Sequence, residues 1–99
     1  MTRDELEKRN VGENLDAIMC LDPRGYGVCR ILYAGSRAYT GEPTAMHAAE
    51  ALCKAIHPGD PVYILVGFVL LPHKVPEMDG TVSAMLLARA LVMAFNAKP

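Results

Sequence analysis

The residues best suited to chemistry are the charged side chains of a short loop, PHKVPEMDG, between Pro72 and Gly80. Glu77 and Asp79 are two positions apart, so in an extended chain their side chains lie about 7 Å apart on one side. This separation suits two carboxylates that share a small polar substrate or a metal ion. His73 could add a metal ligand, but no cysteine or second histidine follows it at ligand spacing. We therefore assign Glu77 and Asp79 as candidate catalytic residues, predict no metal site and identify no cofactor.

Two further features could hold an anionic substrate. A helix N-terminus is expected at Gly80-Thr81, with Thr81 or Asp79 as its cap, and it would attract a carboxylate or phosphate by about 0.3–1 kcal/mol. Arg24 lies in a glycine-rich turn and could bind a carboxylate through two parallel hydrogen bonds. The alternative interpretation is that the loop is a solvated connection and that Arg24 is an exposed turn residue.

The candidate loop follows the longest apolar run of the sequence, residues 62–71. This run is rich in β-branched and aromatic residues and is bounded by glycine and proline, which predicts a strand over 62–70. Because the strand is apolar on both faces, it should be covered on both, as is a central strand of an α/β sheet. Ligands of such sheets bind beyond the carboxyl ends of the strands, which adds Gly67 and Phe68 to the candidate site.

Helical periodicity accounts for most of the remaining sequence. Thr2 and Glu5 fit a capping box at the start of the first helix, although Asn10 offers a second start. Gly41 is a natural stop for the second helix, for which a short strand over 28–33 is the rival interpretation. The four helices are expected over residues 3–21, 28–40, 44–56 and 82–95. The predicted fold class is therefore α/β, with helices packed around a mostly parallel sheet, as part of a larger three-layer domain.

Length, charge and cysteine content exclude several classes of protein. With 99 residues and a net charge of −1, the chain is one domain at most and has no basic surface for nucleic acid. No apolar segment reaches the ~20 residues that span a bilayer, and the N-terminal residues lack the apolar core of a secretion signal. The three cysteines show no CxxC spacing, which indicates free thiols. We expect a cytoplasmic protein that binds neither nucleic acid nor membrane.

The last predicted helix creates a packing problem. Between Val82 and Phe95 only Ser83 and Arg89 are polar, so this helix should be buried on more than one side. The predicted strand has a related problem, because its main-chain groups lack hydrogen-bond partners unless another strand pairs with it. We expect residues 1–99 to be the N-terminal part of a longer domain, or to complete the sheet by pairing with another chain as a homo-oligomer. Alone, the chain is expected to be oligomeric, molten or insoluble.

Short motifs along the chain occur in a characteristic order. They are Asn14–Asp16, Leu21–Val28, Gly41–Pro43, Ala48–Leu52, Pro58–Asp60, Val66–Phe68, Pro76–Gly80 and Leu87–Leu91. This order resembles the N-terminal part of the D-glutamate cyclase-like domain family, formerly a domain of unknown function. Most of the specificity lies in the Gly-Phe pair after the strand, the Glu-x-Asp-Gly loop and the Leu-Ala-Arg-Ala-Leu helix.

The resemblance implies a hydro-lyase that interconverts D-glutamate and 5-oxo-D-proline with loss or gain of water. Ring closure requires the α-amine of D-glutamate to attack its γ-carboxyl group, which needs a base, an acid and an electrostatic clamp. Glu77 and Asp79 are the candidates for acid and base, and Arg24 and Gly80 are the candidates for holding the α-carboxylate. The residues expected to bind the substrate are Arg24, Gly67, Phe68 and Gly80.

The loop departs from the family pattern, which reads Glu-Thr-Asp-Gly followed by proline and glycine. Met78 takes the threonine position, and residues 81–83 take that of the proline and glycine. This departure favours an alternative function of a different class. In that alternative the chain is a non-catalytic module that binds a small carboxylate or phosphate at the Gly80 helix N-terminus.

Overall fold

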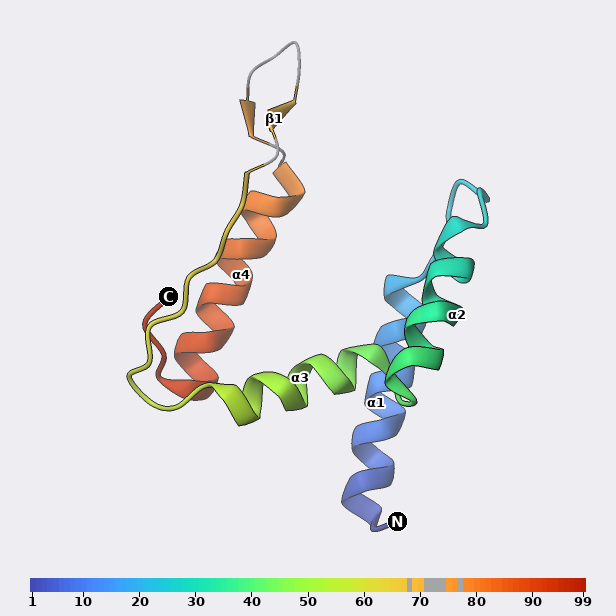
Figure 1. Cartoon of the computed structure of the whole chain (residues 1–99), viewed down its shortest axis with the longest axis horizontal. Helices are drawn as coiled ribbons and strands as arrows, with labels where there is room; N and C mark the ends of the chain where they lie inside the picture. The colour runs from blue at the N-terminus through green and yellow to red at the C-terminus, as the bar shows by residue number, and fades with distance from the viewer. Residues whose placement is uncertain (68, 71–74, 77) are drawn as a thin grey trace. The chain divides into compact units, whose positions relative to one another are not determined.

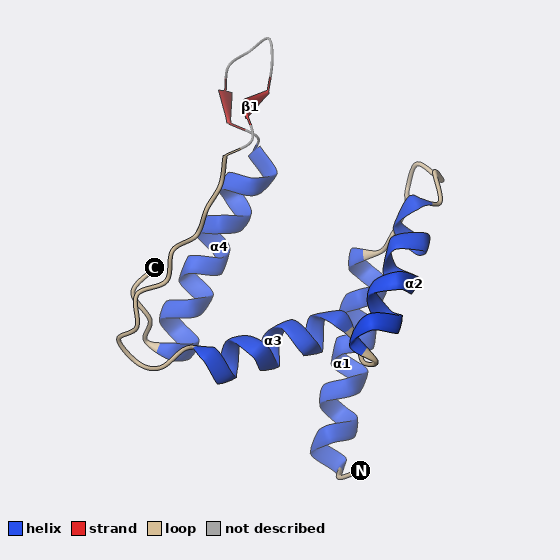
Figure 2. Cartoon of the chain, in the orientation of Figure 1, coloured by secondary structure: helices blue, strands red, loops and turns tan. Residues whose placement is uncertain are grey.

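A computed structural model of the chain describes residues 1–67, 69–70, 75–76 and 78–99 (Figure 1). These residues form two units, Met1–Leu52 and Cys53–Pro99. Figure 2 shows the elements by type: α1 (Arg3–Met19), α2 (Val28–Thr40), α3 (Thr44–Ala55), β1 (Val69–Leu70), β2 (Val75–Pro76) and α4 (Met78–Phe95). The first unit holds α1, α2 and most of α3, and the second holds the end of α3, both short strands and α4.

The first helix starts where its cap residues predict. The Thr2 hydroxyl accepts a hydrogen bond from the N–H of Glu5 (3.2 Å), and the Glu5 carboxylate accepts one from the N–H of Thr2 (2.6 Å). The predicted capping box is therefore confirmed, and Asn10 lies inside the helix instead of starting it. α1 ends at Met19 with Cys20 as its C-cap.

The second helix is bounded by glycines. Gly27 before it and Gly41 after it have φ values of 77° and 73°, a left-handed conformation that glycine adopts without a Cβ penalty. The turn before the helix is closed by Asp22, whose carboxylate accepts hydrogen bonds from the N–H groups of Gly25 (3.1 Å) and Gly27 (2.6 Å). The predicted stop at Gly41 is confirmed, and the rival strand over 28–33 is wrong.

The predicted α/β fold with a parallel sheet is wrong. Among the described residues the only strands are β1 and β2, which pair antiparallel with each other. Residues 62–67 of the expected strand 62–70 have no regular secondary structure. A strand needs a ladder partner, and the described segments supply only an isolated parallel bridge between Pro61 and Lys98. Among the described residues of this apolar run, only Val69–Leu70 belongs to a sheet, the two-stranded one with β2.

The apolar run instead follows α4 as an extended segment, residues 61–67 (Figure 1). At one end, the N–H of Val62 donates to the carbonyl of Lys98 (2.9 Å), and the N–H of Lys98 donates to the carbonyl of Asp60 (2.8 Å). At the other end, Val66 approaches the first turn of α4. The segment is thus attached at both ends and covers one side of the helix.

The last helix begins at Met78 rather than at Val82, so Asp79 and Thr81 lie inside α4 and do not cap it. Leu91 is only 2% exposed, but Leu86 is 65% exposed. Other large apolar side chains of α4 are exposed as well, namely Val82, Met85, Leu87, Val92 and Met93. The expectation that this apolar helix is incompletely covered within the chain is confirmed for the part of α4 whose burial is described.

Candidate functional site

The structure brings two of the predicted site residues to the same end of the second unit. Gly67 is exposed at the end of the extended segment, directly after Val66. Gly80 lies in the first turn of α4, and a Cβ built on it would lie 3.9 Å from Cγ1 of Val66. This is an ordinary van der Waals distance. The end of the apolar run and the first turn of α4 are therefore neighbours.

The other residues of the predicted loop are described only in part. Glu77 and Phe68 lie outside the described residues, as do His73 and Lys74. The backbone of Asp79 belongs to α4, and its side chain is outside the description. Because Asp79 is helical, the separation of about 7 Å expected for an extended chain does not apply to it. The acid and base roles of Glu77 and Asp79 stay predictions.

Arg24 belongs to the first unit. It is exposed in the turn between α1 and α2, whereas Gly67 and Gly80 belong to the unit Cys53–Pro99. The structure therefore does not assemble all the predicted substrate-binding residues within one unit. The role of Arg24 as a clamp for the α-carboxylate stays a prediction.

A buried polar network in the first unit centres on Asp16, a residue that its sequence pattern did not mark as part of a site. Asp16 is 2% exposed. Its carboxylate accepts hydrogen bonds from the N–H groups of Thr44 (2.7 Å) and Ala45 (2.8 Å) and from the hydroxyl of Tyr33 (2.7 Å). The first N–H groups of a helix lack partners within the helix. Asp16 of α1 therefore caps α3 from a distant position in the sequence.

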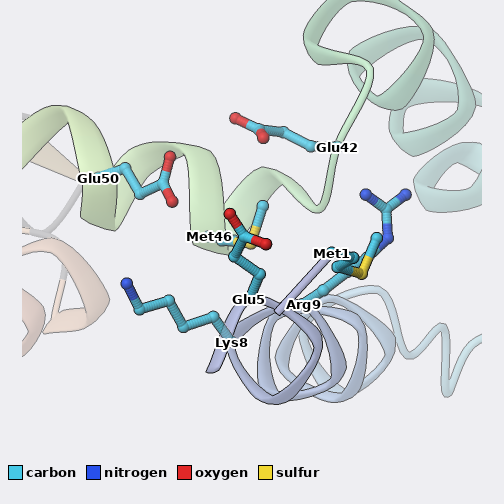
Figure 3. A pocket seen from close by; sticks show the side chains of 7 residues that line it. All are labelled: Met1, Glu5, Lys8, Arg9, Glu42, Met46 and Glu50. Carbon is cyan, nitrogen blue, oxygen red and sulfur yellow. The ribbon is translucent and has the colours of Figure 1, made fainter. Parts of the chain in front are cut away.

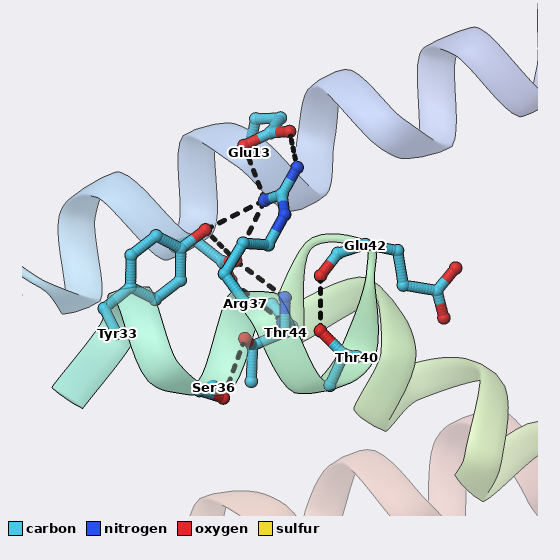
Figure 4. A network of polar contacts seen from close by, with 9 residues as sticks. Glu13, Tyr33, Ser36, Arg37, Thr40, Glu42 and Thr44 are labelled. Carbon is cyan, nitrogen blue, oxygen red and sulfur yellow. Dashed lines mark hydrogen bonds and ion pairs between the residues drawn. The ribbon is translucent and has the colours of Figure 1, made fainter.

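Arg37 extends this network to Glu13 (Figure 4). Its guanidinium donates two hydrogen bonds to the Glu13 carboxylate and one to the Tyr33 hydroxyl (2.9 Å). A bidentate pair of this kind is charge-assisted and fixes the orientation of both side chains. The network therefore holds α2 and the start of α3 against α1.

The network also sets the ionisation of its members. Burial by itself raises the pKa of Asp16, but hydrogen bonds from Tyr33 and the Ala45 and Thr44 N–H groups outweigh this effect and hold that pKa below its ordinary value. The hydrogen bonds with Arg37 lower the pKa of Glu13, and they raise that of Arg37. The hydrogen bond to Asp16 raises the pKa of Tyr33. The carboxylates of Asp16 and Glu13 are therefore ionised near neutral pH, so neither is suited to donate a proton.

The contacts of this network have a structural role. Within the described part of the chain, every buried side-chain nitrogen or oxygen has a hydrogen-bond partner, so the network has no buried polar atom to offer a substrate. One sequence signal could have revealed it. Gly12 and Asp16 are four positions apart in a helix and therefore lie on the same face. Because glycine has no side chain, a neighbouring element can approach this face closely.

We expect Asp16 to make the first unit sensitive to acid. Because the folded-state pKa is lower than the unfolded value of about 3.9, the stabilisation is complete above that value and is lost as the pH falls through the folded pKa. The urea midpoint should therefore decline as the pH falls below about 4. The decline should be smaller in an Asp16→Ala variant, and equal declines in both proteins would contradict the assignment.

An open pocket of about 500 Å³ lies between α1 and α3 in the first unit (Figure 3). Its lining residues are Met1, Glu5, Lys8, Arg9, Glu42, Met46 and Glu50. Glu5 is already part of the capping box, and Glu42 contacts Nδ1 of His47 at 2.6 Å. The charges of both signs lie on long side chains around an open space, and they do not converge on one point. This pocket is therefore a weaker candidate than the Gly67–Gly80 region.

Among the described residues, no group of three or more histidine, cysteine, aspartate or glutamate side chains is arranged to hold a metal ion. In the same part of the chain, no helix has the length and apolar character needed to cross a membrane. Cys20, Cys29 and Cys53 are free thiols.

No protein-family model matches the chain, and no curated protein or solved structure shows significant similarity to it. The resemblance to the D-glutamate cyclase-like domain family therefore rests on short motifs and their order. Of the residues in those motifs, only Phe68 and Glu77 lie outside the described part of the chain.

Proposed function

We propose that this chain carries the substrate-binding region of a D-glutamate cyclase-like hydro-lyase, which interconverts D-glutamate and 5-oxo-D-proline plus water in a reducing cytoplasm. The observation that carries the proposal is the proximity of Val66 to Gly80 in the first turn of α4. It supports a shared site for the two segments on which the resemblance mainly rests, residues 66–68 and 76–80.

Each part of this region has a chemical task in ring closure. The α-amine must lose a proton to a base, and one γ-carboxyl oxygen must gain protons and leave as water. Glu77 and Asp79 are proposed for these two roles. The attack is intramolecular, so holding D-glutamate in a folded conformation contributes much of the rate. Gly67 and Gly80 have no side chains, which allows the substrate to lie directly against the main chain.

Turnover is the direct test of this function. The chain is incubated with D-glutamate or with 5-oxo-D-proline, and the mixtures are separated by chiral chromatography. We expect interconversion of the D-enantiomers and no conversion of L-glutamate. A chain that is folded by circular dichroism yet neither converts nor binds the D-compounds would rule the proposal out.

A second candidate function is a non-catalytic module that binds a small carboxylate or phosphate. Met78, which departs from the family pattern, is the first residue of α4 and thus lies in the proposed binding region. Calorimetry with D-glutamate, 5-oxo-D-proline and inorganic phosphate separates the two functions. Phosphate binding without turnover supports the second function, whereas selective binding of the two D-compounds with turnover supports the first.

Gly80→Ala should separate binding from folding. Among the described side chains the added Cβ meets Val66 alone, at 3.9 Å, and Gly80 does not have positive φ. Alanine in a helix is therefore expected to raise the free energy of unfolding by about 0.5–1 kcal/mol. If the substrate lies against this backbone, the methyl group should weaken binding about tenfold or more.

Gly35→Ala in α2 is the matched control, because nothing lies within 4 Å of a Cβ at Gly35. It should give a similar gain in stability and leave D-glutamate affinity unchanged. Equal affinities of the two variants would place the substrate away from Gly80.

A further inference from the structure

Three main-chain hydrogen bonds join the start of the extended segment to the residues that follow α4. The N–H of Gly59 donates to the carbonyl of Asn96 (2.9 Å). The N–H of Lys98 donates to the carbonyl of Asp60 (2.8 Å), and the carbonyl of Lys98 accepts from the N–H of Val62 (2.9 Å). Together these residues form what we call the clasp. It fixes the first residues of the extended segment against the end of α4.

The clasp requires the chain to reverse after α4, and Asn96 makes this reversal. Asn96 has a φ of 52°, and among the described residues it is the only one besides glycines with a positive φ. Its N–H donates to the carbonyl of Val92 (3.0 Å), the bond that ends a helix at a left-handed residue. Ala97, the next residue, is 5% exposed, and its N–H donates to the carbonyl of Leu91 (3.4 Å). The chain therefore runs from Asn96 back along α4 (Figure 1).

Beyond the clasp, the extended segment has few attachments. From residue 63 to residue 67, no main-chain group is hydrogen-bonded to another described residue. The side chains of Val62 and Ile64 are half-buried, and Val66 lies against Gly80, where a Cβ would be 3.9 Å from Cγ1 of Val66. The path of the segment along α4 therefore depends on where the clasp fixes its start.

The segment has no spare length between the clasp and Gly80. An extended chain spans at most about 3.6 Å per residue, so the chain from Val62 to Val66 covers about 14 Å. The helix from Leu91 back to Gly80 rises about 16.5 Å. Val66 therefore reaches Gly80 only if the segment is extended and starts slightly on the Gly80 side of Leu91. The clasp meets this requirement, because Ala97 is bonded to Leu91 and the chain continues from there back along the helix.

We propose that Asn96 is a positioning residue of the candidate site, because its left-handed conformation sets how far the extended segment reaches along α4. Asn96 acts through the clasp, which holds Val62 at the position from which Val66 contacts Gly80. One part of this inference rests on the proposed function, namely that D-glutamate binds against Gly67 and Gly80. The position of the segment itself is measured without a ligand.

Asn96→Val tests this role. A β-branched residue resists the left-handed conformation, so the reversal after α4 should be lost and the clasp should open. Asn96→Gly is the conservative variant, since glycine adopts this conformation without a penalty, and it should keep the clasp closed. Asn14→Val is the control for the substitution itself, because Asn14 is exposed within a helix of the other unit.

Gly59→Ala opens the clasp from its other side and leaves the sequence of α4 unchanged. Gly59 has a φ of 87°, which alanine rarely adopts, although no described atom lies within 4 Å of a Cβ there. The hydrogen bond from Gly59 to Asn96 should therefore be weakened without a steric clash. If Asn96→Val does not fold, Gly59→Ala still tests the proposal.

NMR measures both the clasp and the position of the segment. In the unmodified chain, we expect slow exchange of the amide protons of Val62 and Lys98, which belong to the clasp. We also expect a nuclear Overhauser effect between the methyl groups of Val66 and the Hα protons of Gly80, which reports that the two segments meet.

The variants should change these two signals together. In Asn96→Val and Gly59→Ala, both clasp amides should exchange about tenfold faster or more, and the Overhauser effect should weaken. In Asn96→Gly and Asn14→Val, both signals should match those of the unmodified chain. Circular dichroism should show that all four variants keep their helices.

Calorimetry with D-glutamate connects the clasp to the proposed site. The two variants that open the clasp should bind D-glutamate about tenfold or more weakly, and Asn96→Gly should bind it as the unmodified chain does. If the unmodified chain does not bind D-glutamate, the proposed function is wrong, and the NMR signals still decide whether Asn96 positions the segment.

Four results would overturn the proposal. The first is fast exchange of both clasp amides in the unmodified chain. The second is an unchanged Overhauser effect in variants whose clasp amides exchange fast, and the third is an effect of Asn96→Gly as large as that of Asn96→Val. The fourth is unchanged D-glutamate affinity in variants whose clasp is open, which would show that the site does not depend on the position of the segment.

Discussion

Replacing Asp16 with alanine should lower the free energy of unfolding by about 3 kcal/mol. The carboxylate is 2% exposed and accepts three hydrogen bonds, two of them from the first N–H groups of α3. Its loss would leave these N–H groups and the Tyr33 hydroxyl without their partner. Leaving a buried donor unsatisfied costs about 1–3 kcal/mol, and removing a helix cap costs about 1 kcal/mol.

Urea unfolding followed by circular dichroism measures this loss, and NMR signals of α3 show where it acts. Asn14→Ala is the matched control, since Asn14 is exposed on the same helix and is two positions away. It should change stability by no more than about 0.5 kcal/mol. Asp16→Asn should also destabilise the chain, because its amide nitrogen would face a donor. A neutral result for Asp16→Ala would mean that α3 does not depend on this cap.

Helix ends were predictable because their signals are local. Thr2 and Glu5 are three residues apart and complete a capping box with no help from the rest of the chain. Gly41 ends α2 because its own backbone conformation favours glycine. The start of α4 was not predictable in this way, since Thr81 and Asp79 looked like caps but lie inside the helix.

The prediction of a strand over 62–70 was wrong because strand pairing is not a local property. Residues 62–67 have the composition of a buried strand, yet composition does not supply a ladder partner. The burial of Asp16 was not predicted for a related reason. Its hydrogen-bond partners Thr44 and Ala45 are distant in sequence, and its position one helical turn after Gly12 is the one local sign that it is buried.

The proximity of Gly67 and Gly80 was predictable from the sequence, whereas the position of Arg24 was not. Gly67 and Gly80 were selected because a loop after a long apolar run leads into a helix, and Val66 does approach the first turn of α4. Arg24 was selected for its chemistry alone, as an arginine in a flexible turn. Arg24 belongs to the other unit. The sequence did not indicate this, because a residue type does not specify which parts of a chain pack together.

Gly12→Val should lower the free energy of unfolding by about 3 kcal/mol, as overpacking of a close helix contact does. A Cβ on Gly12 would lie 2.9 Å from the Cβ atoms of both Pro43 and Met46. These atoms are held close to the backbone and cannot rotate away, so α1 and the start of α3 must separate. Asp16 lies one turn further along the same face, and its bonds to Thr44 and Ala45 would lengthen as well.

Gly35→Val is the control for the substitution itself. Gly35 lies in α2 with nothing within 4 Å of an added Cβ, so valine there should change stability by only a few tenths of a kcal/mol through helix propensity. Urea unfolding of both variants at neutral pH measures the difference. If the two substitutions have the same effect, the close packing of α1 on α3 is not a source of stability. A large loss confined to Gly12→Val would instead show that Gly12 and Asp16 fix one helix contact together, the glycine by allowing the approach and the carboxylate by capping the helix that approaches.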